Sequence, residues 1–140
     1  MEVLHYNLDM TPESEWKIVS AGAFARDKLL YLQEAGHFIS GANYYTVRKE
    51  LDSYLVKLTL SGAGILEYGG ETYRLPAGSF FWIDCRAPQH YYTAPDTGQW
   101  DVLCSIFTAQ RRMRTIRRFC RRRRGGQPRR CRSTVRCPRR

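Results

Sequence analysis

The sequence predicts an all-β fold, a jelly-roll barrel at residues 21–107, and three observations carry this prediction. Short apolar or alternating runs separated by turn residues fill residues 36–107, as they do in β-sandwiches and barrels. No ten-residue helical period interrupts these runs, so we expect strands there. Residues 108–140 are too rich in Arg to bury a core, and we expect a disordered basic tail.

The first half of the barrel follows residues 1–20, which we interpret as an N-terminal arm. Residues 28–33 and 43–47 are the first expected strands. In residues 54–60 every second side chain is apolar, and we expect this face to point inward. The face consists of Tyr54, Val56, Leu58 and Leu60. Glycines within residues 61–64 are expected to end this strand.

The second half of the barrel begins with a hairpin across Gly69 and Gly70. A two-residue hairpin loop requires positive φ angles, which glycine adopts readily. Residues 79–84 are apolar on both faces, which predicts a central strand covered on both sides. The strands of this half are expected at residues 65–68, 71–75, 79–84, 89–93 and 100–107.

The net charge of +10 combines two opposite compositions. Residues 1–110 hold eight Lys and Arg and all 13 acids, a net charge of −5, whereas residues 111–140 hold 15 Arg and no acid. Three interpretations of this tail stay open: an arm that neutralises phosphates, a solvated disordered terminus, and the product of a reading-frame shift in GC-rich DNA. We favour the third, because mixed Lys and Arg give way to Arg alone within a few residues of Phe107.

Cysteine usage and hydrophobicity indicate the compartment. Five Cys without a C-x-x-C pair predict reduced thiols rather than a disulfide framework or a zinc site. No apolar run approaches the roughly 18 residues of a membrane helix, and residues 1–10 do not read as a secretion leader. We therefore expect a cytoplasmic protein with no membrane partner.

A resemblance to a known family lies mainly in residues 54–92, which read YLVKLTLSGAGILEYGGETYRLPAGSFFWIDCRAPQHYY. This order of strand, SG-x-G, GG hairpin, PAG turn and ID-x-x-x-P-x-H-Y resembles the cupin sensor domain of AraC-type transcriptional regulators. The similarity extends upstream through AGHFISGANYYTVR at residues 35–48 and downstream to Trp100. It implies a double-stranded β-helix that binds a small effector, often a sugar, and that helps the regulator to dimerise.

In such regulators two helix-turn-helix motifs follow the sensor and read DNA in the major groove. This sequence shows neither motif. Cys104 also stands where the family pattern W-x-x-x-W-V-x-F has its second Trp. We therefore expect the family's own sequence to end after about residue 103, and the dimerisation helices and the DNA reader to be missing.

A closed barrel can enclose a small cavity, and the resemblance implies that a small effector binds inside it. The candidate residues are Tyr44, Arg48, Trp82, His90, Tyr91 and Trp100. Arg48 matches a position where the family has a sugar-contacting Arg. Its guanidinium fork suits hydroxyls or a carboxylate, and the alternative is a solvated charge on a strand.

The remaining candidates are aromatic or imidazole side chains with two open roles each. His90 and Tyr91 match a late-strand pair of the family that either reaches ligand oxygens or forms a hydrogen-bonded cluster at the barrel mouth. Trp82 and Trp100 either stack on a sugar ring or pack in the core, and the same holds for Tyr44.

The sequence predicts a binding module rather than an enzyme. Metal-dependent cupins use an H-x-H pair, a Glu and a later His, and only His90 stands at such a place. No nucleophile is paired with a base, so we expect no catalytic residue, metal or cofactor. The favoured function is effector sensing, with a small, possibly sugar-like molecule and a possible homodimer partner. The alternative is non-specific nucleic-acid binding through the Arg-rich tail.

Overall fold

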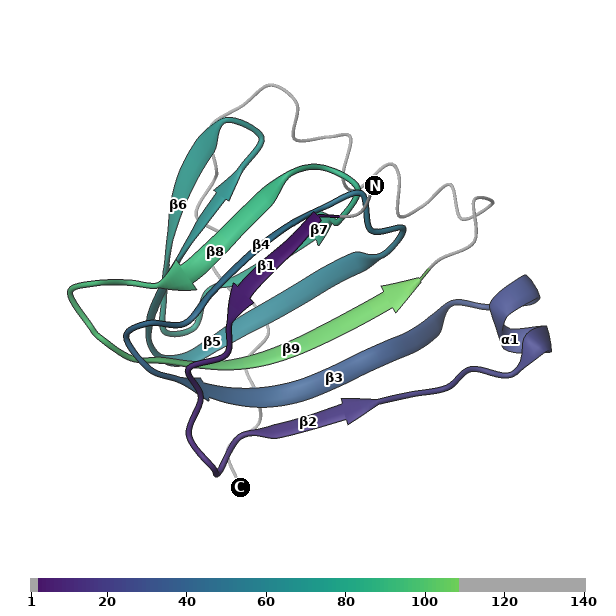
Figure 1. The fold of residues 1–140 in the computed structure, drawn as a ribbon, viewed down its shortest axis with the longest axis horizontal. Helices are drawn as coiled ribbons and strands as arrows, with labels where there is room; N and C mark the ends of the chain where they lie inside the picture. Colours follow the sequence, from purple (N-terminus) through teal and green to yellow (C-terminus); the bar gives the residue numbers. More distant parts are fainter. Residues whose placement is uncertain (1–2, 109–140) are drawn as a thin grey trace.

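The structure is a computed structural model that describes residues 3–108, and it confirms the all-β prediction. All strand pairs are antiparallel, and together they curl into a half-barrel (Figure 1). The strands are β1 (Val3–Asn7), β2 (Glu15–Ile18), β3 (Tyr31–Ser40), β4 (Tyr45–Lys49), β5 (Tyr54–Tyr68), β6 (Glu71–Pro76), β7 (Phe80–Asp84), β8 (Gln89–Thr93) and β9 (Trp100–Thr108). Of the expected disordered tail at 108–140, Thr108 ends β9, and the rest lies outside the described residues.

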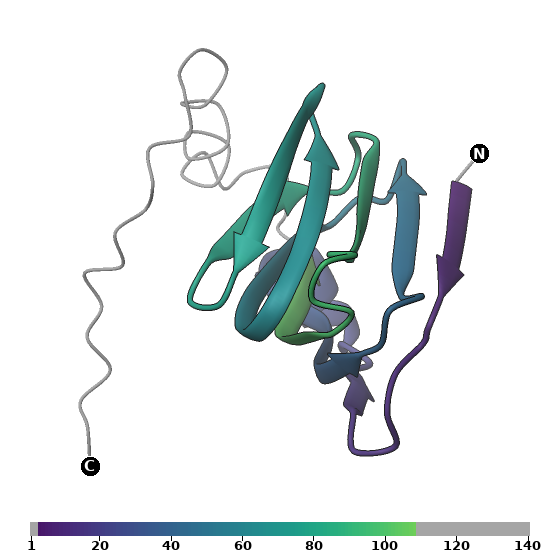
Figure 2. The ribbon, with the colours of Figure 1, turned by 90° about the vertical axis from the view of Figure 1, so that its left-hand side faces the viewer.

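Strand β5 belongs to both halves of the curled sheet. Its first part pairs with β7 and β9, and its second part pairs with β6 and β8. We call the half that contains β1, β4, β8 and β6 sheet A, and the half that contains β2, β3, β9 and β7 sheet B. Figure 2 shows β1 at one edge of sheet A, beside β4. The space between the two sheets holds the core.

The expectation that residues 61–64 end a strand is wrong, because β5 runs through them without interruption. The strand bends instead. Its register with β9 shifts between Thr59 and Ser61, which is a β-bulge, and Gly62 has a φ of 67°. A Cβ at Gly62 would lie 2.1 Å from the Gln99 carbonyl oxygen, so only glycine allows this close approach. The bend lets one strand serve both sheets.

The inward face of β5 is the opposite of the predicted one. Leu55, Lys57 and Thr59 are buried, with exposed fractions of 1%, 2% and 2%, whereas Leu58 and Leu60 are 36% and 42% exposed. The apolar face therefore lies on the outside of sheet B. The interior accepts Lys57 because aromatic rings surround its ammonium group, as described below.

The other strand predictions hold with local corrections. The hairpin at Gly69 and Gly70 is confirmed, with φ angles of 64° and 84°. Strand β7 is not central: among the described residues it pairs only with β5, and Phe80 is 45% exposed. The strand expected at 28–33 begins later, at Tyr31, because helix α1 (Ala23–Lys28) precedes it.

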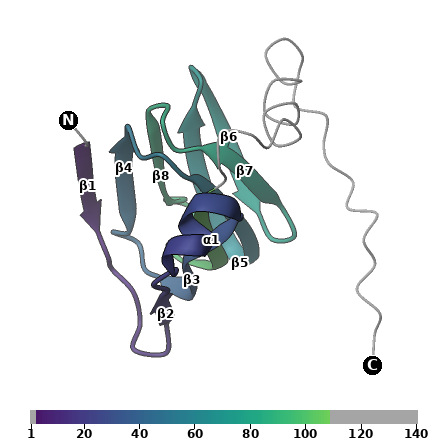
Figure 3. The same cartoon turned by 90° about the vertical axis from the view of Figure 1, so that its right-hand side faces the viewer.

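The N-terminal segment adds one edge strand to each sheet. β1 pairs with β4 in sheet A, and β2 pairs with β3 in sheet B. Helix α1 connects β2 to β3 at one end of the molecule (Figure 3). Within residues 3–108, no helix has the length and apolar character needed to cross a membrane.

Candidate functional site

The interior between the sheets is lined by aromatic side chains from several strands. Tyr91 on β8 is 3% exposed, Trp100 on β9 is 0% exposed and Phe38 on β3 is 7% exposed. Tyr44, just before β4, is 2% exposed and packs its ring edge against Trp100 at a centroid distance of 6.1 Å. Side chains alternate between the two faces of a strand, so the neighbours of these residues face outward.

Lys57 lies at the centre of this aromatic cluster. Its Nζ donates a hydrogen bond to the Tyr44 hydroxyl at 2.9 Å. The same atom lies 4.3 Å from the centroid of the Tyr91 ring, 4.9 Å from Trp100, 5.0 Å from Tyr44 and 5.6 Å from Phe38. Ring faces attract a cation, which partly replaces the water that the ammonium group loses on burial.

The interior shifts the acid–base properties of its own groups. Burial lowers the pKa of Lys57, and the nearby charge of Arg48 lowers this pKa further. Burial raises the pKa of Tyr91 to about 12 and that of Tyr44 well above its ordinary value. Both tyrosines therefore keep their hydroxyl protons at neutral pH and remain hydrogen-bond donors.

Trp100 forms one wall of the interior and is held in place on both sides. Its Nε1 donates to Thr59 Oγ1 at 3.0 Å, and Thr59 Oγ1 in turn donates to the Leu75 carbonyl at 3.3 Å. The ring lies directly over Gly64, where a Cβ would come within 2.4 Å of it. Glycine at this position is required for Trp100 to lie flat against β5.

Arg48 on β4 and Gln89 on β8 are register partners at one end of the interior. Among the described residues, the buried Arg48 Nε and Nη1 and the buried Gln89 Oε1 have no hydrogen-bond partner. Two buried hydroxyls, Ser40 Oγ and Thr93 Oγ1, have none either. Buried polar atoms normally have partners, so water or a bound ligand is needed to satisfy this set.

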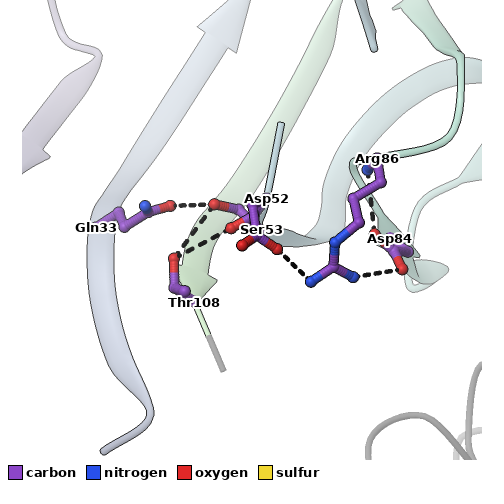
Figure 4. Close-up of polar contacts among 6 residues, drawn as sticks. All are labelled: Gln33, Asp52, Ser53, Asp84, Arg86 and Thr108. Carbon is purple, nitrogen blue, oxygen red and sulfur yellow. Dashed lines mark hydrogen bonds and ion pairs between the residues drawn. The ribbon is translucent and has the colours of Figure 1, made fainter. Parts of the chain in front are cut away.

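A polar network ties the loops at this end of the interior to the end of β9 (Figure 4). Ser53 Oγ donates to Gln33 Oε1 at 2.6 Å and lies 3.3 Å from Thr108 Oγ1. Arg86 bridges the carboxylates of Asp52 and Asp84.

The same network continues into the site through the backbone. Cys85 N–H donates to the Ser53 carbonyl at 2.9 Å, and Gln89 Nε2 donates to the Cys85 carbonyl at 3.3 Å. Burial raises the pKa of the Cys85 thiol to about 11, so the thiol stays protonated. The residues around Arg48 are thus linked to the last described residue of β9.

The structure brings four of the six predicted site residues together: Tyr44, Arg48, Tyr91 and Trp100. His90 instead points outward from sheet A, where its Nδ1 lies 3.0 Å from Glu67 Oε2. Trp82 lies on the outer face of β7, edge-on to Phe107 at a centroid distance of 5.6 Å.

Sequence reasoning missed Lys57 and Gln89. A Lys in a strand is usually solvent-exposed, and nothing in the spacing marked this one as buried. Strand alternation, however, indicates that His90 and Tyr91 cannot both face the same side, and that Gln89 and Tyr91 must.

Other parts of the described chain offer less for chemistry. Residues 3–108 contain no group of three His, Cys, Asp or Glu side chains placed to hold a metal ion. A hollow of about 280 Å³ lies along β2, β3 and β9, and none of the six predicted residues lines it. It is lined by Glu15, Lys17, Ala35, Gly36, His37, Leu103 and Cys104.

Comparisons with known proteins agree with this geometry. Residues 31–134 match the model of the AraC-like ligand-binding domain, a span that runs past residue 103 and whose last part lies outside the described residues. Among solved structures, a predicted oxalate decarboxylase from Thermotoga maritima superposes with a TM-score of 0.53 at 14% identity, covering 76% of this chain and 92% of that one.

A second solved structure comes from a regulator. The cupin domain of an XRE-family transcriptional regulator from Enterobacter cloacae gives a TM-score of 0.51 at 11% identity, covering 70% of this chain and 98% of that one. At these identities the two structures show a shared fold only. A comparison with curated proteins finds no match. Because the family match covers most of the sequence, the chain belongs to the family of AraC-like ligand-binding domains, built on a cupin fold.

Proposed function

We propose that this chain is the effector-sensing domain of an AraC-type transcriptional regulator and that it binds a small, sugar-like molecule between its two sheets. The observation that carries the proposal is the set of unpartnered polar atoms on Arg48 and Gln89, at one end of an interior that the rings of Tyr91 and Trp100 line. Ring faces suit the apolar face of a sugar, and the polar atoms suit its hydroxyls. In this proposal, the activity of the site is binding.

DNA reading, in this proposal, is the task of another part of such a regulator. The helix content of residues 3–108 is α1, a single helix of six residues, whereas a helix-turn-helix motif needs two helices. The sensing domain would influence a reader through the end of β9, where the network of Ser53 and Thr108 lies.

The test of effector binding is ligand-induced thermal stabilisation of the full chain across a panel of sugars, polyols and sugar acids. A ligand at 100 times its Kd stabilises the native state by about 2.7 kcal/mol. Two matched variants locate the site. Tyr91→Phe removes an interior hydroxyl, and Tyr92→Phe makes the same change on the outer face, where Tyr92 donates to Glu67.

We expect Tyr91→Phe to reduce the stabilisation by a bound effector and Tyr92→Phe to leave it unchanged. A panel in which no compound stabilises the chain would count against effector sensing. Stabilisation that is lost in Tyr92→Phe and kept in Tyr91→Phe would place the ligand outside the interior.

We also infer that the domain pairs with a second copy through the outer face of sheet B. Leu58, Leu60, Phe80 and Leu103 on this face are between 36% and 45% exposed. A row of exposed apolar side chains on a sheet favours protein contact. Asp84 and Asp101 alternate onto the same face of β7 and β9, so the contact we propose is the row of apolar side chains itself.

A further inference from the structure

Two basic side chains lie in the interior of the domain without an acidic partner. Lys57 is 2% exposed, and its one hydrogen bond within residues 3–108 goes to the neutral Tyr44 hydroxyl. Arg48 has two buried nitrogens, Nε and Nη1, without a hydrogen-bond partner among the described residues, and its guanidinium also acts on the neighbouring Cys85 thiol, which is neutral. The Arg48 charge also acts on Lys57, since it lowers the pKa of that amine. The two groups therefore share one electrostatic environment.

The acids nearest to this environment are engaged elsewhere. Glu34 raises the pKa of Lys57, but it is the last and smallest of the causes that act on that amine. Its Oε2 accepts a hydrogen bond from Trp16 Nε1 at 2.7 Å. Glu67 lies on the outer face of sheet A with His90. Within the described part of the chain, no carboxylate neutralises the interior.

An unpaired buried charge is unfavourable, and the two basic groups differ in how they can respond. Lys57 can release its proton, which its lowered pKa favours. Arg48 cannot, because a guanidinium group stays protonated in proteins. Arg48 is partly buried, and an anion from outside the chain is the partner that would neutralise its charge where Nε and Nη1 are buried.

The geometry of Arg48 fits such an anion. Its unpartnered nitrogens, Nε and Nη1, both belong to the guanidinium fork that binds two oxygens of a carboxylate or a phosphate. Gln89, its register partner, presents an unpartnered Oε1 that can accept a hydrogen bond from a ligand hydroxyl. Tyr91 and Trp100 supply ring faces around Lys57, further along the same interior.

We propose that the effector carries an anionic group, a carboxylate or a phosphate ester, that binds the free edge of Arg48, while Lys57 adds positive potential from the centre of the site. This inference rests on the proposed sensing function and narrows its ligand class. The body of the effector lies against Tyr91 and Trp100, and its hydroxyls reach Gln89.

The test compares matched ligands that differ only in the anionic group. Thermal unfolding of the full chain is measured with galacturonate against galactose, glucuronate against glucose, and glucose 6-phosphate against glucose. We expect at least one anionic member to bind at least tenfold more tightly than its neutral partner. The carboxylate and phosphate arms distinguish the two sources of charge.

Two variants test whether Arg48 is the group that binds the anion. Arg48→Met removes the guanidinium, and we expect it to abolish the preference for the anion. Lys49→Met removes a charge from the next residue of β4, whose side chain alternates to the outer face, and should leave the preference intact. Anion binding to the Arg-rich tail would persist in Arg48→Met, so persistence of the preference overturns the inference.

Lys57→Met gives a second readout that needs no ligand. If the interior lacks its anion, replacing the ammonium by an apolar side chain of similar length raises the Tm of the ligand-free chain. A lower Tm in Lys57→Met overturns the inference, even if no compound in the panel binds. Equal stabilisation by an acid and its neutral partner, with Tyr91→Phe sensitive to both, overturns the anionic class and leaves the sensing function in place.

Discussion

Gly64→Ala tests whether the wall of the site depends on the close contact between β5 and Trp100. The new Cβ would lie 2.4, 2.5 and 2.6 Å from three atoms of the Trp100 ring, well inside contact distance. Trp100 is 0% exposed, and Nε1 is bonded to Thr59, so the ring cannot withdraw without losing that hydrogen bond. Overpacking of this kind costs about 1–3 kcal/mol, and a lost buried hydrogen bond adds about 1 kcal/mol.

Alanine also recovers some stability, because it reduces the backbone entropy of the unfolded chain by up to about 1 kcal/mol. The net expected loss is about 1–3 kcal/mol, which lowers Tm by at least about 4 °C in a domain of this size. Thermal and urea unfolding followed by near-UV circular dichroism measure it. We expect effector-induced stabilisation to fall as well, since the displaced ring is part of the site.

Two further variants test whether the overlap with Trp100 causes the loss of stability in Gly64→Ala. Gly22→Ala is the matched control, because nothing lies within 4 Å of its Cβ and its φ is −65°. In the double variant Gly64→Ala/Trp100→Phe the smaller ring relieves the overlap, so its loss should be less than the sum of the two single losses. A Gly64→Ala variant as stable as the wild type, or strictly additive losses, would show that the contact with Trp100 does not set the cost.

Three other predictions address acid–base chemistry, metals and assembly. Burial raises the pKa of Tyr91 to about 12 in the folded state, whereas its ordinary value is near 10. Between pH 10 and about pH 12 the folded state therefore keeps a proton that the unfolded state has lost. The corresponding stability, up to about 2–3 kcal/mol, is present below pH 10 and lost as pH rises towards 12. Tyr91→Phe should flatten this part of the stability profile, and an unchanged slope would disprove the assignment. EDTA should leave the Tm of the chain unchanged, because residues 3–108 hold no group of three side chains placed to bind a metal ion. A fall in Tm of several degrees that added zinc or iron reverses would contradict this prediction. Phe80→Glu should shift sedimentation of the chain towards the monomer. Phe24→Glu, at a 70% exposed position on α1, should leave sedimentation unchanged. If the two variants sediment alike, the outer face of sheet B is not the interface.

The local sequence pattern was sufficient to predict the bounds of those strands whose ends are marked by turns. Gly69 and Gly70 define the hairpin because both adopt positive φ, and β8 occupies the expected residues 89–93. Strand length was less predictable. The glycine at position 62 bends β5 rather than ending it, because the β-bulge preserves pairing with β9 on either side. A bend and an end have the same local sequence signal.

The inward face of β5 could not be predicted from hydrophobicity. Tyr54, Val56, Leu58 and Leu60 form the more apolar face, yet Lys57 and Thr59 lie inside. Burial of Lys57 depends on rings from β8, β9 and the residues before β4, which are distant in sequence. Such a cluster exists only after folding, so no local pattern reveals it.

Only part of the candidate site could be predicted, because some of its contacts also join residues that are distant in sequence. Arg48 and Tyr91 came from a resemblance to a family, Trp100 came from the stacking of aromatic rings on sugars, and all three face the interior. His90 came from the same resemblance and Trp82 from ring stacking, but strand alternation places both on outer faces, beside Glu67 and Phe107. The period of two separates His90 from Tyr91, because neighbours along a strand face opposite sides of the sheet.

The most direct measurement is a crystal structure of the full chain with the compound that stabilises it most. We predict density for that compound between the two sheets, with its anionic group on Arg48 Nε and Nη1 and its ring against Trp100. Density for the compound in the hollow beside His37, on the outer face of sheet B or along the Arg-rich tail would contradict binding in the interior.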